Sequence, residues 1–404
     1  MTGSKVSAFL RKYMMLIALV AVVIFFNIAT QGKALYAQNI TNLIAQNAYV
    51  FVLATGMLLC ILTGGNIDLA VGSVVCFAGG VGAIIMDKNI PWPVAVVVMI
   101  VMGILIGMWQ GFWIAFVKVP PFIATLAGML AFRGLANVVM GGFAYSITDK
   151  TYLNIFGGGA DCYIPDLFAG IGPSITTADG TALNKFCLCT GIIIAVAFAV
   201  YTFLHRAYLK KNGYNLPSLV ADVVKMVVIC AAVVWLFYKL AAYKGIPTSL
   251  LWIAFVLGLF AYITTKTTLG RNLYAVGGNE KATRLSGINT KMVMFKAYTL
   301  MGLLAGFAGV LNTARFVGAQ PTYGTGYEMD AIAACFIGGA SAYGGTGSIG
   351  GVIVGALMMG VINMGMDIMG TSSNYKLVVK GLVLLFAVFF DVVMKMRKKG
   401  GVKS

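Results

Sequence analysis

The sequence predicts an all-α protein, a polytopic transmembrane helical bundle, on three observations. Hydrophobic residues make up 60% of the 404 positions and charged residues only 10%, whereas soluble domains are about 45–50% apolar and about 25% charged. The mean hydropathy is high, at +0.92. Glycine occurs 50 times, and small residues let transmembrane helices pack closely. We therefore expect one transmembrane domain over residues 1–404, with several broken or short helices.

Each expected span is an apolar run close to the roughly 20 residues that cross the hydrocarbon core of a bilayer. The first run, 14–29, follows Lys5, Arg11 and Lys12. It lacks a convincing cleavage site, so we expect a retained helix rather than a signal peptide. The other runs, in chain order, are 48–62, 70–86, 93–116, 122–140, 188–204, 223–240, 249–263, 293–311, 330–339, 349–368 and 378–394.

The basic residues predict the orientation of the chain. If the N-terminus is cytoplasmic and each run crosses once, most of the 29 Lys and Arg residues fall in cytoplasmic segments, as is usual in membrane proteins. We therefore expect a multi-pass protein with both termini in the cytoplasm. The formal net charge of +17 then belongs to short loops beside the lipid bilayer, and we expect no nucleic-acid partner.

A polar segment with the sequence GRNLYAVGGNEKATRLSG, residues 270–287, separates two of the apolar runs. Asn279 is a favourable N-cap, and Glu280 then falls in the first helical turn, where a carboxylate suits the helix dipole. Gly287 stands where a left-handed C-terminal stop is expected, and the two glycines before Asn279 permit a sharp turn. The pattern predicts a capped surface helix over 280–286, although an ordinary polar loop shows similar signals.

This short helix has features of a docking element for another protein. Ala282 and Leu285 are three residues apart, so they share one side of the helix and present an apolar face to a groove. Glu280 and Arg284 are four apart, so they either pair with each other or meet charges on a partner. We favour the partner, because the helix is polar, capped and held between membrane spans.

Two glycine pairs interrupt apolar runs and predict broken helices. An acid lies near each pair, Asp68 after the first and Asp330 before the second. Transporters commonly use broken helices in corresponding halves to line a pathway, because irregular backbone at membrane depth needs cover from protein or water. The alternative is that both pairs are packing points. The candidate pathway residues are Gly64, Gly65, Asn66, Asp68, Ser73, Asp330, Gly338 and Gly339.

Other charged residues in or beside the spans are few, and buried charges in membranes are usually paired. We expect Arg133 to form a structural pair with one of the acids, which include Asp391. A proton relay in a secondary transporter is the mechanistic alternative, but it needs several ionisable groups together. His205, the single histidine, falls at a predicted cytoplasmic turn. These counts favour a pathway for uncharged cargo.

No pattern indicates an enzyme, a cofactor or a metal site. The sequence has no G-x-x-x-x-G-K-[ST] loop that would hold ATP phosphates and no nucleophile with an adjacent base. Cys187 and Cys189 are too few and wrongly spaced for zinc. Whether Cys162 pairs with one of them stays open. We therefore expect a chain that is not an enzyme and does not itself hydrolyse ATP.

Four stretches together resemble a known family. Besides 270–287, they are LTGGNIDLAVGS at 62–73, VPPFIATLAGMLAFRG at 119–134 and AQPTYGTGYEMDAIAACFIGGASAYGG at 319–345. In their order along the chain, the four stretches are similar to permease subunits of bacterial ABC sugar importers of the ribose, galactoside and xylose type. The stretch at 119–134 looks most like the xylose-type members. The resemblance extends from about residue 45 to residue 391 and is weakest over 143–250.

The resemblance implies about ten core spans, with an extra two-helix hairpin over about 188–240 and a cytoplasmic coupling loop over about 266–292. We expect the exported loop 147–185 either to cover the periplasmic mouth or meet a binding protein, or to be a plain solvated loop. The ATPase-coupling residues would be Gly278, Asn279, Glu280, Ala282, Arg284, Leu285 and Gly287.

The resemblance also implies the partners and the cargo. The partners would be a cytoplasmic ABC ATPase, an extracytoplasmic sugar-binding protein and a second permease subunit, most simply a second copy, in a bacterial inner membrane. The cargo would be a neutral monosaccharide of the xylose, galactose/methyl-galactoside or ribose class. Nucleoside or autoinducer importers of the same architecture are the alternative.

Overall fold

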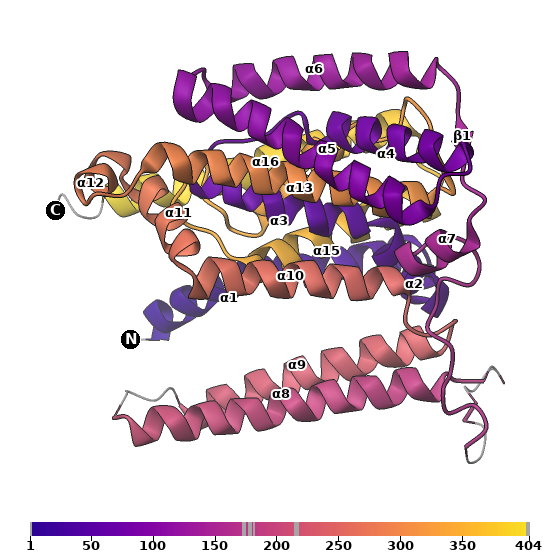
Figure 1. Ribbon diagram of the computed structural model, residues 1–404. Coiled ribbons are helices and arrows are strands. Elements are labelled where there is room, and N and C mark those ends of the chain that lie inside the picture. Colours follow the sequence, from indigo (N-terminus) through magenta and orange to yellow (C-terminus); the bar gives the residue numbers. More distant parts are fainter. Residues whose placement is uncertain (1, 172–174, 177–179, 181, 214–217, 401–404) are drawn as a thin grey trace. The chain divides into compact units, whose positions relative to one another are not determined.

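The computed structural model describes residues 2–171, 175–176, 180, 182–213 and 218–400 (Figure 1). The described chain is mostly helical with almost no strand, as expected, and it divides into two compact units. The first unit comprises residues 1–34, 43–162 and 249–404, and the second comprises 35–42 and 163–248. The helix α2 (Ala37–Gln46) begins in the second unit and ends in the first.

The first unit is a bundle of long helices that run side by side (Figure 1). Every apolar run predicted for this part of the chain is a helix, and most of these helices are longer than their runs. The helices are α1 (Thr2–Ala29), α3 (Ala48–Leu62), α4 (Val71–Asp87), α5 (Trp92–Phe112), α6 (Pro121–Met140), α10 (Thr248–Lys266), α13 (Thr290–Arg315), α14 (Tyr327–Ile337), α15 (Ile349–Ile368) and α16 (Ser373–Gly400).

Helix α13 forms the centre of this bundle and packs against α3, α4 and α5. Its closest approach is to α5, where both helices carry a G-x-x-x-G sequence. A Cβ at Gly103 would lie 2.3 Å from the backbone oxygen of Gly302, and a Cβ at Gly306 would lie 2.5 Å from the backbone oxygen of Met99. Only glycine permits such backbone contact, which is the usual role of small residues between membrane helices.

The candidate spans are fewer than the predicted apolar runs. In the described part of the chain, seven helices are long and apolar enough to cross a membrane, or eight if the bent pair α2–α3 counts as one span. Met14–Ala29 and Val71–Asp87 are apolar but shorter, and α14 has only 11 residues. The structure therefore shows a polytopic helical membrane protein, and the exact number of crossings stays a prediction.

One end of the bundle carries small elements that the sequence reading treated as a loop. The strand β1 (Tyr145–Ser146) pairs with β2 (Gly318–Ala319) in antiparallel register. The helix α7 (Lys150–Phe156) follows, capped by Asp149, whose carboxylate accepts hydrogen bonds from the backbone N–H groups of Thr151 and Tyr152 at 2.9 and 3.1 Å. Part of the 147–185 segment is thus ordered helix.

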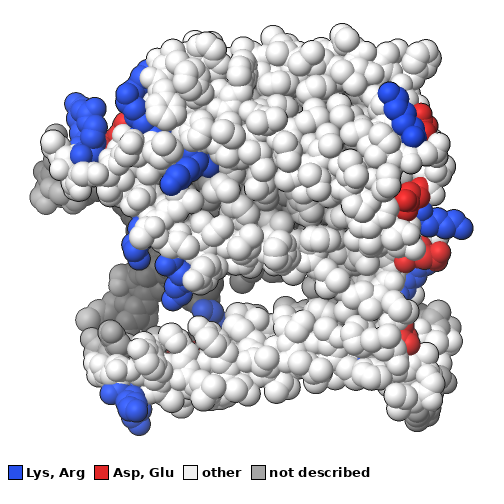
Figure 2. All heavy atoms as spheres, in the orientation of Figure 1, with Lys and Arg blue, Asp and Glu red and all other residues white. Residues whose placement is uncertain are grey.

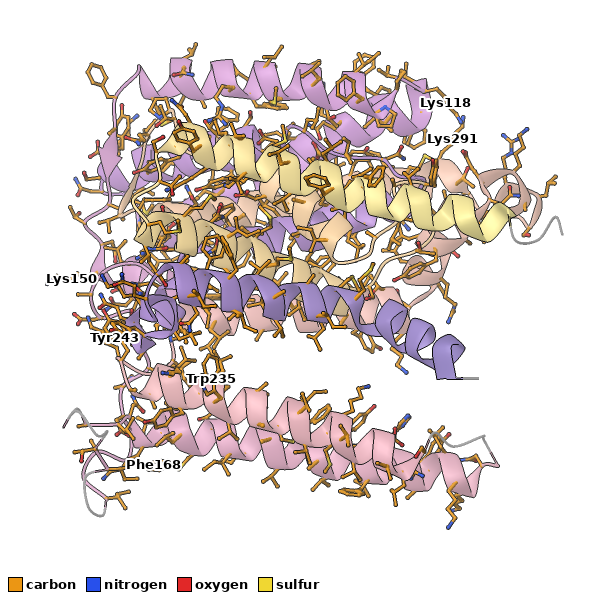
Figure 3. All side chains as sticks on the ribbon, turned by 180° about the vertical axis from the view of Figure 1, so that it is seen from behind. Lys118, Lys150, Phe168, Trp235, Tyr243 and Lys291 are labelled. Carbon is orange, nitrogen blue, oxygen red and sulfur yellow. The ribbon has the colours of Figure 1, made fainter. Side chains whose placement is uncertain are left out.

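The second unit is an antiparallel hairpin of α8 (Lys185–Lys211) and α9 (Leu219–Ala241), as predicted. The two helices approach closely at Gly191, where a Cβ would lie 2.4 Å from Cβ of Phe237. Phe168 and Tyr243 lie at one end of the hairpin (Figure 3). There the carboxylate of Asp166 accepts hydrogen bonds from the backbone of Phe168, Lys185 and Phe186. Partial desolvation raises the pKa of this carboxyl, but the three backbone donors outweigh it and lower the pKa.

All seven cysteines are thiols rather than disulfides in the structure, so a bond of Cys162 with Cys187 or Cys189 is not formed in it. Cys162 and Cys187 are buried. The Cys187 thiol donates a hydrogen bond to the backbone oxygen of Phe237, at 3.4 Å. Its role is therefore local packing within the hairpin.

Candidate functional site

The predicted surface helix is present as α12 (Glu280–Leu285), directly after α11 (Thr268–Gly278). Asn279 is its N-cap, with extended backbone and a side-chain oxygen that accepts from the backbone N–H of Ala282 at 3.0 Å. Gly287 has a φ of +83°, the left-handed conformation expected of a helix stop. The caps read from the sequence therefore position this helix.

The turn before α12 differs from the sequence reading. Gly277 and Gly278 are the last residues of α11, so the expectation that this pair makes the sharp turn is wrong, and the chain turns at Asn279. The two glycines also differ from each other. A Cβ at Gly277 would lie 1.8 Å from the backbone oxygen of Leu62, whereas Gly278 faces open space. Position 277 requires a glycine because of close packing, not because of its backbone conformation.

The face of α12 that points away from the bundle is fully available. The side chain of Leu285 is 88% exposed, and Ala282 and Arg284 are also exposed. The opposite face is anchored, because the buried Thr283 donates a hydrogen bond to the backbone oxygen of Ala275 in α11 at 2.8 Å. The helix is thus held to the protein on one side and presents an apolar side chain on the other.

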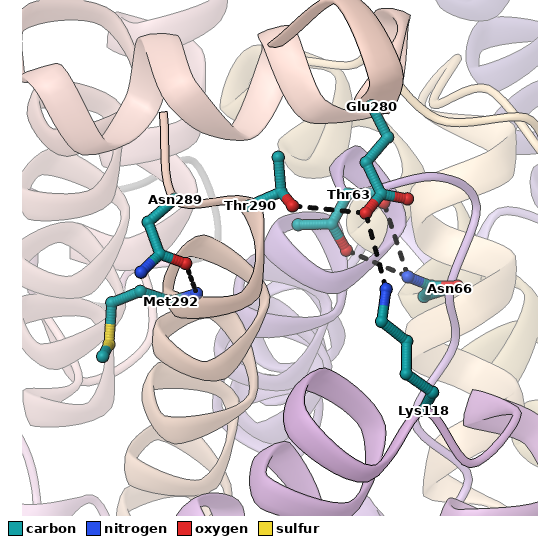
Figure 4. Close-up of polar contacts among 7 residues, drawn as sticks. All are labelled: Thr63, Asn66, Lys118, Glu280, Asn289, Thr290 and Met292. Carbon is teal, nitrogen blue, oxygen red and sulfur yellow. Dashed lines mark hydrogen bonds and ion pairs between the residues drawn. The ribbon is translucent and has the colours of Figure 1, made fainter. Parts of the chain in front are cut away.

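Glu280 has partners within the chain, and Arg284 is not its ion-pair partner. The Oε1 atom of Glu280 accepts a hydrogen bond from the hydroxyl of Thr290 at 3.2 Å and lies 3.9 Å from Nζ of Lys118 (Figure 4). The pairing of Glu280 with Arg284 is therefore wrong for the described structure. Both partners of the ion pair are half exposed, so the pair itself adds little stability. It ties α12 to the segment after the short π-helix Trp113–Val117.

The first glycine break lies between α3 and α4. Gly64 and Gly65 have φ angles of +127° and +78°, and Asn66 donates a hydrogen bond to the Thr63 hydroxyl at 3.2 Å. Asp68 is 2% exposed, and its carboxylate accepts from the backbone N–H of Ala70 at 2.9 Å. The break is therefore a built turn that buries an acid.

This break packs against two other glycine-rich segments, and we call the contact the glycine junction. It consists of Leu62–Gly65, Gly277, and the loop Ala342–Gly345. The backbone N–H of Gly345 donates to the oxygen of Leu62 at 3.1 Å, and a Cβ at Gly65 would lie 2.0 Å from the oxygen of Ala342. A Cβ at Gly277 would lie 2.4 Å from the nitrogen of Gly345. Helix α11, which directly precedes α12, thus contacts the first break and the loop after the second break.

The second glycine break follows α14 and is built differently. Gly338 has a φ of −69° and packs against α15, where its Cβ would lie 2.4 Å from the oxygen of Gly351. Gly339 alone of the pair has a positive φ, +81°. Two neighbouring turns of α14 separate this break from Asp330.

Asp330 is held by two other helices. It is 1% exposed, and its carboxylate lies 2.8 Å from Nζ of Lys380 in α16 and accepts a 2.7 Å hydrogen bond from the hydroxyl of Tyr49 in α3. Sequence reasoning missed Lys380, although a lone lysine within an apolar run is a signal that a buried acid is near. Asp330 therefore joins three helices.

The expectation that Arg133 pairs with one of the candidate acids is wrong. Its guanidinium donates to the backbone oxygens of Pro321 and Tyr323, at 3.1 and 2.6 Å, so it holds a loop and forms no ion pair within the described residues. Ser73 is fully buried, and Asp391 has its side chain outside the described residues. Asp68, Ser73 and Asp330 are all closed off from solvent in this conformation.

Comparisons with known proteins cover nearly the whole chain. The model of the family described as the branched-chain amino acid transport system / permease component matches residues 39–388. The xylose transport system permease protein XylH of Escherichia coli K12 is 35% identical over 390 residues, which cover 96% of this chain and 93% of that protein. The same protein from Haemophilus influenzae is 36% identical over 383 residues, covering 95% and 96%.

A second kind of relative is named for another sugar. The ribose import permease protein RbsC of E. coli K12 is 34% identical over 354 residues, which cover 87% of this chain and 85% of that protein. No solved structure matches the chain.

Proposed function

The chain belongs to the family of branched-chain amino acid transport system permease components, and on that premise we propose that it is the membrane subunit of an ATP-binding-cassette importer for a neutral monosaccharide. It is a transport subunit rather than an enzyme. The proposal that the cargo is a sugar rests on the likeness to a xylose permease over 96% of the chain. The likeness to a ribose permease is shorter.

The charges of the bundle support uncharged cargo. An amino acid carries an ammonium and a carboxylate, and buried charges in a membrane are stabilised by partners. Of the two candidate pathway acids, Asp330 is already neutralised by Lys380. Sugars need hydrogen bonds rather than fixed charges, so a bundle with few ionisable groups suits them. This favours a sugar over the branched-chain amino acid in the name of the family.

The partner at α12 is a separate cytoplasmic ATPase in this proposal. Leu285 is exposed on a helix that is anchored from behind, and the glycine junction connects that helix to the first break. An extracytoplasmic sugar-binding protein would meet the opposite end, which carries α7 and β1, and a second copy of the chain would complete the pathway.

The orientation has support from the distribution of charge. Lys118 and Lys291 lie at the end of the bundle that carries α12, and Lys150 lies at the other end (Figure 3). On the visible face, the α12 end shows mostly Lys and Arg side chains, whereas at the other end acids and basic side chains lie together (Figure 2). A basic excess marks the cytoplasmic side, so we place α12 and both termini in the cytoplasm of a bacterial inner membrane.

The test is uptake into vesicles that contain the chain with its ATPase and binding protein. Labelled xylose, ribose, galactose, a nucleoside and leucine are compared with and without ATP. We expect ATP-dependent uptake of one monosaccharide that an uncoupler leaves unchanged. Uptake of leucine, or uptake that collapses with the uncoupler at constant ATP, would contradict the proposal. Labelling of a cysteine at Asn279 by an impermeant reagent from outside would contradict the orientation.

A further inference from the structure

A cavity of about 260 Å³ lies between the two helices of the hairpin. It is at the end where α8 finishes and α9 begins, and residues of both helices line it. The lining has two kinds of side chain. His205, Arg206, Lys225 and the single acid Asp222 are polar, whereas Phe198 and Met226 are among the apolar ones.

The position of the cavity relative to the bilayer follows from the sequence of α8. The apolar run 188–204 ends immediately before His205. At 1.5 Å per residue this run is about 25 Å long, close to the hydrocarbon thickness. His205 and Arg206 therefore lie at the level of the lipid headgroups, and Phe198 lies about two turns deeper. The cavity spans the boundary between headgroups and acyl chains.

The charges of the lining favour an anion. Arg206 forms an ion pair with Asp222 across the two helices, so these two charges balance. Lys225 is exposed and forms no ion pair within the described residues, which leaves the lining with a net positive charge. The ring of His205 is stacked on Tyr201, with centroids 5.7 Å apart. Nearby Lys210 and Lys211 make this end of the hairpin basic.

The surroundings favour an anion that carries an apolar tail. Large side chains along the hairpin face outward, among them Ile193, Val200 and Leu204 on α8 and Val220 and Val227 on α9. Such a surface is suited to acyl chains, and basic pockets between membrane helices on the cytoplasmic side bind anionic headgroups. We propose that this cavity binds the phosphate headgroup of an anionic phospholipid, with its acyl chains along the hairpin.

The proposal is independent of the cargo and of the ATPase, so it stands or fails without the proposed function. It requires only that the hairpin spans a membrane and that the cavity holds a phosphate anion. Free inorganic phosphate has the same headgroup chemistry without the tail. The apolar lining distinguishes the two, because it contributes only to binding of the lipid.

The test is native mass spectrometry of the full-length protein in detergent with phosphatidylglycerol or phosphatidylcholine. We expect preferential retention of phosphatidylglycerol. Lys225→Gln should lower this retention about fivefold, the factor that one basic residue contributes near an anionic surface. Asp222→Asn should raise it, because the lining loses its negative charge. A matched control is Lys211→Gln, which removes the same charge at the same end without lining the cavity, and its effect should be below about twofold.

Three results would overturn the proposal. The first is equal retention of the two lipids, and the second is an equal effect of Lys225→Gln and Lys211→Gln. The third is displacement of phosphatidylglycerol by millimolar inorganic phosphate together with phosphate binding in the absence of lipid, which would assign the site to the free anion. Circular dichroism of each variant checks that the hairpin stays helical. Opposite signs for Asp222→Asn and Lys225→Gln also separate binding from misfolding, since misfolding lowers retention in both.

Discussion

At the first glycine break, both Gly64 and Gly65 have positive φ angles, whereas at the second only Gly339 does, and Gly338 is the C-cap of α14 with a φ of −69°. The acids differ too. Asp68 accepts a backbone hydrogen bond from the next helix, whereas Asp330 binds Lys380 and Tyr49 from two other helices. The same sequence pattern thus leads to two different arrangements. The first break is a backbone turn beside α11, and the second lies after a helix whose acid forms a charge contact with other helices.

The two breaks are therefore held in place by different contacts. The first break is held by glycine contacts to the segment that carries α12, so motion of α12 would reach it directly. Before the second break, Asp330 is tied to α3 and α16, so the position of α14, which leads into this break, depends on an ion pair. Replacing Gly277 should therefore act on the first break, and replacing Lys380 should act on the helix before the second break.

The largest effect is expected at the second break. Lys380→Met leaves the buried Asp330 without its cation, and removing one partner of a buried pair costs roughly 3–5 kcal/mol of stability. Thermal denaturation in detergent measures the loss, and adding Asp330→Asn should restore most of it. The matched control is Lys376→Met on the same helix, since its partner Asp367 is 53% exposed and surface pairs contribute about 0–1 kcal/mol. Equal losses in the two single variants would contradict this account of Asp330.

The next effect is expected at the first break, where adjacent glycines provide their own control. Gly277→Ala places a methyl group against the backbone of Leu62 and Gly345, and such overpacking typically costs about 1–3 kcal/mol. Gly278→Ala places the same group in open space, so it should change stability by less than about 0.5 kcal/mol. ATP-driven uptake should fall with the first variant alone. Similar behaviour of the two variants would show that the glycine junction is not a close contact.

The smallest effect is expected from Asp68→Asn. The amide oxygen of asparagine can still accept the hydrogen bond from Ala70, so only the difference between a charged and a neutral bond is lost, about 1 kcal/mol. Uptake should remain ATP-driven at every pH tested. A change in the proton dependence of uptake in this variant would instead make Asp68 part of a proton relay.

The sequence predicted features that depend on nearby residues. Apolar runs located the long helices, and the spacing of Asn279, Glu280 and Gly287 gave the caps of α12, because caps are formed by residues within a few positions. The acid expected beside Arg133 was wrong and the partner of Asp330, Lys380, was missed, because these contacts join residues far apart in the sequence. The expected contact of Glu280 with a charge on another protein stays a prediction.

Gly277 shows a second kind of limit. A glycine pair is compatible with a turn, a helix end or a close contact, and only the position of Leu62 in space decides among them. The strand pair β1–β2 was missed for a related reason, since two-residue strands leave no periodic pattern. Lys380 is different, because a lone lysine in an apolar run was visible and could have been matched to a buried acid.

We propose that α12 binds an ATPase, and the substitution Leu285→Asp changes the side chain that this proposal places in the contact. Because Leu285 is 88% exposed, the substitution should leave the stability of the isolated chain within about 0.5 kcal/mol. A charge placed in an apolar groove of the partner should lower co-purification of the ATPase about tenfold or more. Ser286→Asp adds the same charge at the next exposed position and is the control, expected to keep most of the binding. Wild-type co-purification and binding-protein-stimulated ATP hydrolysis in Leu285→Asp would show that α12 is not the docking element.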